Sequence, residues 1–162
     1  MLFKKVAKMN ILGIDPGSRK IGYAVLNFQG SKSKILVAGF IENKEETFYN
    51  GLSTVAKEFE DIFSSYQIDE VAIEDIFYAY NPKTVIRLAQ FRGAICMSIL
   101  KHKDIFFEYS ALQVKKAVTG NGKSTKVQVA FIIRKLFNIK EEIKVLDITD
   151  AIAIALTHKQ RV

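Results

Sequence analysis

The sequence is poor in several residue types, and each shortage excludes a class of protein. The 162 residues include one cysteine, Cys96, so no disulfide framework can form within the chain. A single thiol suits a reducing compartment, and we expect a cytoplasmic location. No apolar run approaches the roughly 20 residues that a membrane-spanning helix needs, so we expect no membrane association. Residues 1–9 lack the apolar core of a secretory signal and are expected to form an N-terminal extension.

The remaining composition is that of a folded protein with an excess of positive charge. Apolar residues make up 49% of the chain and charged residues 25%, which predicts a single domain over residues 10–162. Lys and Arg outnumber Asp and Glu by 24 to 17, giving a net charge of +7. Residues 111–140 contain seven bases and no acid, whereas residues 42–75 contain ten acids and two bases. This uneven distribution favours a polyanionic partner bound by the basic segment.

The hydrophobic pattern predicts an α/β fold. Strands are expected over residues 10–15, 21–28, 34–41, 71–74 and 105–108. Helices are expected over residues 45–66, 82–100, 124–137 and 147–158, with a short one opened by a capping-box pattern at Ser110 and Gln113. Three hairpin-linked strands followed by two strands reached through helices predict a five-stranded mixed sheet, three antiparallel and two parallel, with helices on both faces.

Four acids stand next to apolar segments, where acids are not expected. Asp15 and Glu74 end apolar strands, and Asp147 and Asp150 lie on one side of the first turn of an apolar helix. Carboxylates at the carboxyl ends of parallel strands are well placed to hold Mg²⁺, and two such ions can hydrolyse a phosphodiester. Each acid also has a structural interpretation: Asp15 as a turn residue, Glu74 as an exposed strand end, and the two helical aspartates as caps.

Basic and aromatic side chains surround these acids in the sequence. Lys115, Lys116, Lys123 and Lys126 lie around a glycine-rich loop, TGNGK, and could neutralise phosphates, although single surface lysines are usually only solvated. Phe77, beside Tyr78 and Tyr80 in the segment after Glu74, could stack on an unpaired base or fold back onto the core. His158 is interpreted as a helix-end residue, because it lies about 12 Å along the helix from Asp150, too far to share one metal.

Four segments together resemble the motifs of RuvC-type Holliday-junction resolvases, in the family's order. They are ILGIDPGSRKIGYAVL, VAIEDIFYAYNPKTVIRLAQFRG, EYSALQVKKAVTGNGKSTKVQV and DITDAIAIALTH. The resemblance implies an RNase H-like fold and a homodimeric, Mg²⁺-dependent endonuclease that makes symmetric paired nicks in a four-way DNA junction.

The resemblance also implies roles for individual residues and partners. Asp15, Glu74, Asp147 and Asp150 match the metal-binding acids, for two Mg²⁺ ions with Mn²⁺ able to substitute. Phe77 matches the aromatic residue that stacks on bases at the junction. Lys115 and Lys126 match lysines that meet DNA near the scissile phosphate. The family works beside a hexameric branch-migration motor and its junction-binding partner.

Three other functions stay open at the level of sequence. One is an RNase H-like nuclease acting on RNA, similar to YqgF-type proteins, whose Asp-x-Gly turn is close to IDPGSRKIGYAV. Another is a basic DNA-binding module without catalysis, which has no use for carboxylates near phosphates. The last is a sugar kinase or actin-like ATPase, which needs two such domains. The paired aspartates and the VKKAVTGNG segment favour the resolvase.

Overall fold

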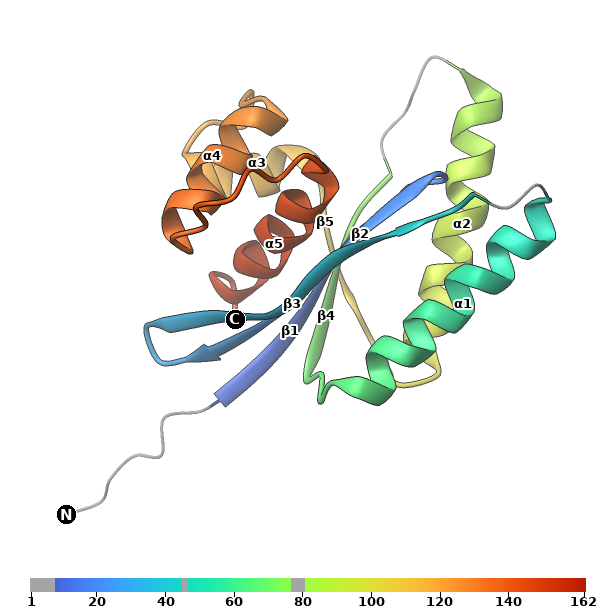
Figure 1. Cartoon of the computed structure of the whole chain (residues 1–162), viewed down its shortest axis with the longest axis horizontal. Coiled ribbons are helices and arrows are strands. Elements are labelled where there is room, and N and C mark those ends of the chain that lie inside the picture. The colour runs from blue at the N-terminus through green and yellow to red at the C-terminus, as the bar shows by residue number, and fades with distance from the viewer. Residues whose placement is uncertain (1–7, 45–46, 77–80) are drawn as a thin grey trace.

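A single five-stranded sheet carries helices on both faces (Figure 1). This computed structural model describes residues 8–44, 47–76 and 81–162. The strands are β1 (Lys8–Asp15), β2 (Lys20–Gln29), β3 (Lys32–Glu42), β4 (Glu70–Glu74) and β5 (Phe107–Tyr109). The helices are α1 (Phe48–Ser65), α2 (Pro82–Leu100), α3 (Ala111–Thr119), α4 (Lys126–Leu136) and α5 (Leu146–Lys159). The order of the elements along the chain is the predicted one.

The sheet has the mixed topology that the sequence predicts. Its strand order is β3-β2-β1-β4-β5. The pairs β1–β2 and β2–β3 are antiparallel, whereas β4 is parallel to β1 and β5 is parallel to β4. The carboxyl ends of β1, β4 and β5 therefore meet at one edge of the sheet, where open α/β sheets bind their ligands.

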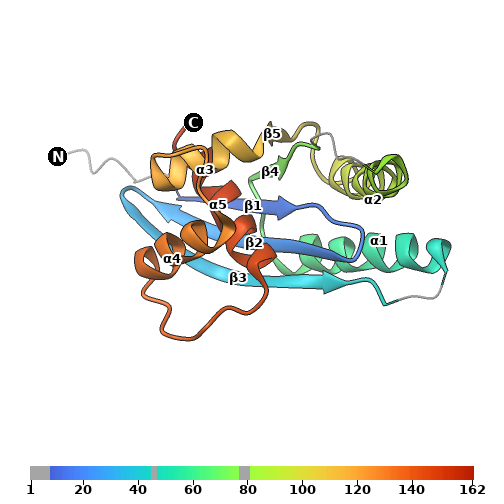
Figure 2. The same cartoon turned by 90° about the horizontal axis from the view of Figure 1, so that it is seen from above.

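Side-chain alternation along the strands decides which residues reach which layer of helices. Ile11 and Ala72 belong to the core beneath α3, α4 and α5, whereas Leu12, Ile14 and Ile73 belong to the core beneath α1 and α2. Figure 2 shows these two helical layers on opposite sides of the sheet. Because side chains alternate with a period of two, Asp15 and Glu74 point to the face that α5 covers.

Helix α5 lies directly on the sheet because two glycines let its backbone approach. A Cβ atom on Gly22 would lie 2.0 Å from the carbonyl oxygen of Asp147, and one on Gly13 would lie 2.2 Å from that of Ala151. The helix is buried without interruption from Thr149 to His158, which agrees with its apolar sequence. This close contact brings the first turn of α5 to the end of β1.

The helix ends follow the predicted capping patterns, with small shifts at other boundaries. Asn81 caps α2 ahead of Pro82, and Ser110 and Gln113 form the capping box of α3. Helix α4 begins at Lys126 rather than at residue 124, because Thr125 and Gln128 form a second capping box. Strand β1 starts at Lys8, two residues earlier than expected.

Strand β5 is displaced from residues 105–108 to Phe107–Tyr109. Residues 1–7 of the predicted N-terminal extension lie outside the described residues. Among the described residues, no helix is long and apolar enough to cross a membrane.

Candidate active site

Three of the four predicted acids converge at the carboxyl end of β1. Asp15, Asp147 and Asp150 each offer a carboxylate oxygen, and these atoms lie within 4.8 Å of one another. Asp15 and Asp150 are only 7% and 8% exposed, whereas Asp147 is partly accessible. Strand alternation and the glycine-mediated seat of α5 produce this arrangement from elements far apart in the sequence.

The structural interpretations of these aspartates do not agree with their surroundings. The residue that caps α5 is Val145, and no side chain makes a capping hydrogen bond there. Asp147 and Asp150 lie within the helix and are not N-caps. Asp15 is buried rather than exposed at a turn. Asp147, in the first turn of α5, can still complement the helix dipole, but two buried acids and a third beside them, none of them a cap, favour a binding function.

A cavity of about 570 Å³ opens over the cluster and contains the fourth acid. Besides the three aspartates, Glu74 and the lysines Lys115 and Lys126 line it. Glu74 is half-buried and lies outside the group of three whose oxygens are closest together. All four predicted acids and both lysines nearest the proposed chemistry therefore face one concavity.

Lys126 is the cation nearest to the cluster and offsets part of its negative charge. Its Nζ lies 2.7 Å from Asp150 Oδ2, 3.7 Å from Asp147 Oδ1 and 3.8 Å from Asp15 Oδ2. Partial burial opposes the charge of this ammonium group, but the surrounding carboxylates outweigh burial and raise the pKa of Lys126. The first turn of α4, begun by the Thr125 cap, carries this lysine to the acids.

The pKa values of Asp15, Glu74 and Asp150 are raised, so their ionised forms would be stabilised by further positive charge. Burial raises the pKa of Asp15 well above its usual range, and neighbouring carboxylates act in the same direction against Lys126. Burial and the charge of Asp150 raise the pKa of Glu74 to about 7. The pKa of Asp150 is also raised by burial, although Lys126 lowers it in part. A cation bound here would relieve this cost.

The donor set fits a hard divalent cation. Three carboxylates with oxygens within 4.8 Å supply the ligand type that Mg²⁺ prefers, and Glu74 adds a fourth in the same cavity. The ammonium of Lys126 lies among these oxygens, as expected for a cluster of negative charge. The open space of the cavity leaves room for substrate oxygens.

Comparison with known proteins decides the family. The profile of the family described as "Crossover junction endodeoxyribonuclease RuvC" matches residues 11–158. The chain is 56% identical over 154 residues to a protein of that name from Sulfurovum sp. (strain NBC37-1), covering 95% of this chain and 97% of the relative. The chain belongs to the RuvC family.

Another relative and a solved structure support the same family assignment. The RuvC protein of Wolinella succinogenes is 57% identical, with 95% of this chain and 96% of the relative covered. The structure of Thermus thermophilus RuvC in complex with a Holliday junction substrate superposes with a TM-score of 0.85 at 25% identity, covering 93% of each chain. The predicted RNase H-like α/β fold is thereby confirmed.

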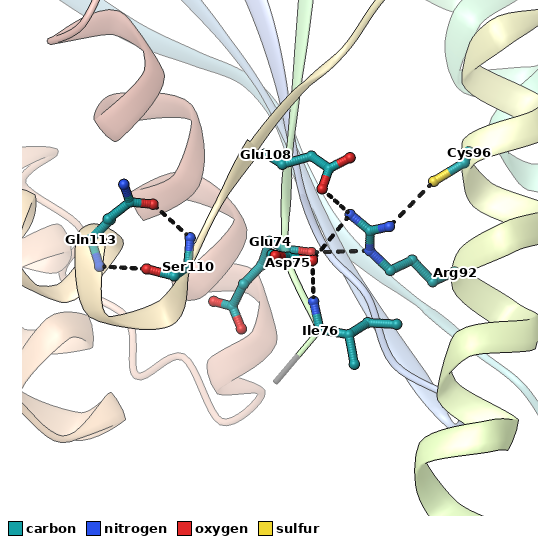
Figure 3. A network of polar contacts seen from close by, with 8 residues as sticks. All are labelled: Glu74, Asp75, Ile76, Arg92, Cys96, Glu108, Ser110 and Gln113. Atoms are coloured by element: carbon teal, nitrogen blue, oxygen red, sulfur yellow. Dashed lines mark hydrogen bonds and ion pairs between the residues drawn. The ribbon is translucent and has the colours of Figure 1, made fainter. Parts of the chain in front are cut away.

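Sequence reasoning missed Arg92, which in this RuvC protein contacts the end of β4, next to the predicted ligand Glu74. Arg92, on α2, donates from Nε to the backbone oxygen of Glu74 at 3.4 Å, and its Nη2 lies 3.2 Å from Glu108 Oε2 on β5 (Figure 3). Its Nη2 is also 3.9 Å from Asp75 Oδ1. The Glu74 side chain points away from Arg92 (Figure 3). One guanidinium thus joins α2, β4 and β5 behind the acid.

A detectable signal for Arg92 does exist in the sequence. It is an arginine between Phe91 and Ile95 on a helix whose neighbouring positions pack against the sheet, and its side chain is only 14% exposed. A charged group at such a position needs partners, and two acids at adjacent strand ends supply them.

The other predicted DNA-binding residues of this RuvC protein do not line the catalytic cavity among the residues that the structure describes. Lys123 is exposed on the loop between α3 and α4. Lys116 lines a separate depression with Gln160 and Arg161 rather than the catalytic cavity. Phe77, the predicted stacking residue, lies outside the described residues, as do Tyr78 and Tyr80. The structure therefore brings together Lys115 and Lys126 with the acids and leaves Lys116 and Lys123 apart from them.

Proposed function

We propose that this protein is a Holliday-junction resolvase, with one nuclease domain over residues 10–162 that acts in the cytoplasm. The observation that carries the proposal is the cluster of Asp15, Asp147 and Asp150, whose oxygens lie within 4.8 Å at the open end of an RNase H-like sheet. Membership of the RuvC family and the fold of its junction-bound Thermus relative support a four-way DNA junction as the substrate.

The four acids hold two Mg²⁺ ions in this proposal, with Mn²⁺ able to substitute. Asp15, Asp147 and Asp150 supply the closely spaced oxygens, and Glu74 supplies a further carboxylate from the wall of the cavity. When bound, the ions supply Lewis-acid stabilisation of the charge on the reacting phosphate and activate water as the nucleophile.

The lysines of the cavity steady the phosphate. Lys126 lies against Asp150 when the acids lack another cation. With a metal held by the carboxylates, the ammonium of Lys126 would be able to turn to a non-bridging phosphate oxygen. Lys115 lines the same cavity and can meet the same phosphate. Preorganised cations at the position where charge develops lower the barrier without added reorganisation.

The reaction is hydrolysis of the bond between phosphorus and the 3′ oxygen. The water oxygen forms a bond to phosphorus as the bond to the 3′ oxygen breaks, and the water's proton is released as the leaving oxygen becomes protonated. The products are a 5′-phosphate and a 3′-hydroxyl. Phe77 holds an unpaired base near the cut, and Lys116 and Lys123 contact more distant phosphates.

A homodimer provides the two cuts that resolve a junction. The exposed face of α2 carries Ile86, Met97 and Leu100, which are 59%, 64% and 46% exposed. Gly93 lies on the same face, and a Cβ added there would meet nothing within 4 Å. These four residues are separated by seven, four and three positions, so they lie along one side of α2. A second α2 helix can pack against this side around a two-fold axis. The branch-migration motor and its junction-binding partner act on the same junction.

The first test is cleavage of a synthetic mobile four-way junction, beside linear duplex and structured RNA, with Mg²⁺ and with a chelator. Paired symmetric nicks in the junction alone, lost on chelation, are expected. Cutting of RNA in preference to the junction would contradict the proposal and favour a YqgF-type activity. Binding of the junction without cutting at any Mg²⁺ concentration would instead favour a non-catalytic module.

A further inference from the structure

A second cavity of about 630 Å³ lies beside the catalytic one and is lined by three cationic side chains. Arg19 comes from the turn between β1 and β2, and Lys83 and Arg87 come from the first half of α2. The remaining lining residues are Ser18, Asn43, Thr47, Phe48, Thr84 and Phe91. No carboxylate occurs among these residues, so the cavity combines positive charge with hydroxyl and amide groups.

The three cations of this cavity are not neutralised by any carboxylate of the described residues. In the part of the chain that the structure describes, none of them forms an ion pair. The guanidinium of Arg87 lies 4.3 Å from the centre of the Phe48 ring, which positions it without neutralising it. A stacked guanidinium keeps its planar fork free for the oxygens of a phosphate.

Two separate elements show that the two cavities are immediate neighbours. In the turn after β1, Pro16 and Gly17 line the catalytic cavity, and the next residue, Ser18, lines the second one. On α2, Leu88 lines the catalytic cavity and Arg87 lines the second. Adjacent Cα atoms are about 3.8 Å apart, so a ligand needs to cross only this turn to reach both cavities.

We propose that the second cavity binds the sugar-phosphate backbone of the junction strand a few nucleotides from the cut, an inference that rests on the proposed function. A DNA strand carries one phosphate per roughly 3.4 Å of helix axis, so a strand held at the acids presents further phosphates at the neighbouring cavity. Arg19 and Arg87 bind non-bridging oxygens, and the hydroxyls of Ser18 and Thr84 donate to them. Such contacts fix the strand's position without reading its sequence.

The test compares two double variants that remove equal charge. Arg19→Gln with Arg87→Gln removes two cations from the cavity. Lys32→Gln with Lys34→Gln removes two exposed cations from the β2–β3 hairpin, at the end of the sheet away from Asp15 (Figure 1). Junction affinity is measured with Ca²⁺ at several salt concentrations. We expect the cavity variant to raise Kd by about 10–100-fold and to reduce the slope of log K against log salt by about 2.

The outcomes separate this inference from the proposed function. Affinity and slope that match those of the hairpin variant would overturn the inference, even if the unaltered enzyme cuts junctions. Failure of the unaltered enzyme to cut junctions would overturn the proposed function itself. Because Arg87 contacts Phe48, its loss could disturb folding, so Lys83→Gln serves as a second variant. A rise of several-fold in its Kd, with an unchanged Tm, supports the cavity, and an unchanged Kd contradicts it.

Discussion

The two ends of α5 both bury polar side chains, but they do so in opposite ways. At the end of the helix, His158 is fully buried, with Nδ1 2.8 Å from the Tyr109 hydroxyl and Nε2 2.7 Å from Glu70 Oε2. At its start, Asp147 and Asp150 gather with Asp15, and Lys126 is the cation among them. One cluster satisfies its hydrogen bonds, whereas the other places like charges together.

The contrast separates a cluster that stabilises the fold from one that serves chemistry. Buried polar groups with partners on both sides link elements, and His158 links α5 to β4 and β5. Buried carboxylates without enough partners destabilise the fold, as their raised pKa values indicate, and they persist where a ligand compensates. Substitutions at the two ends of α5 are therefore expected to separate stability from activity.

The largest effect is expected from Asp15→Asn. Loss of this ligand is expected to reduce junction cleavage by at least about 10³-fold, or roughly 4 kcal/mol in the barrier. Stability is expected to change in the opposite direction. Because burial raises the pKa of Asp15, its ionised form destabilises the metal-free fold at pH 8, and the neutral amide removes that cost. Single-turnover cleavage and the Tm of metal-free protein measure the two effects.

Asp150→Asn serves as a companion to this variant. It is expected to lose cleavage while it still binds the junction, although its contact to Lys126 makes any gain in Tm smaller. A fall in Tm for Asp15→Asn that matches its loss of activity would show that the acids are structural.

The next effect belongs to the opposite end of the helix. His158→Ala removes a fully buried ring whose centre lies 4.3 Å from that of the tilted Phe107 ring, and it leaves Glu70 and Tyr109 without their partner. We expect a loss of about 2–4 kcal/mol in the free energy of unfolding, or roughly 5–15 °C in Tm. Denaturant titration measures it, and Tyr109→Phe should lose less because only one hydrogen bond is removed. Cleavage by the folded fraction at low temperature should persist, and its loss together with stability would place His158 in the catalytic site.

A smaller effect is expected at Arg92, which lies behind Glu74 and outside both clusters. Arg92→Gln is expected to lower the maximal cleavage rate about 10-fold and to raise the Mg²⁺ concentration needed for half of it, because the end of β4 loses its anchor. Junction affinity measured with Ca²⁺ should stay the same. Glu108→Gln is the matched control, since it removes the nearer of the two carboxylate partners of Arg92 and leaves the contact to the Glu74 backbone. Equal loss in both variants would show that the ion pair, rather than the anchor on Glu74, matters.

The sequence predicted where the four acids lie on their own strands and helix better than it predicted how those elements pack together. Alternation along β1 and β4 places Asp15 and Glu74 on one face of the sheet, and the three-residue step places Asp147 and Asp150 on one side of α5, but these local patterns do not bring the two pairs together. The close packing of α5 on Gly13 and Gly22, by contrast, brings together segments that are distant in the sequence. Sequence reasoning interpreted His158 as a helix-end residue, but its two partners come from strands 49 and 88 residues away. Contacts of this range have no local signature, whereas Arg92 had one, an arginine among the sheet-facing positions of a helix, that sequence reasoning did not use.

The smallest effect is a pH dependence at the acidic end of α5. Burial and Asp150 raise the pKa of Glu74 from an ordinary value of 4.5 to about 7. The folded state therefore holds this proton more tightly than the unfolded chain, and the stability that it contributes is full below about pH 4.5 and lost as the pH rises through about 7. The Tm of metal-free protein should fall by a few degrees over this window relative to Glu74→Gln, which lacks the titrating group. Ca²⁺ should raise the Tm more at pH 8 than at pH 5.5, because only the ionised acids bind it. A Tm difference between the two proteins that stays constant with pH would show that Glu74 is ionised in the folded state throughout, and that the acids of this end are as well satisfied as His158.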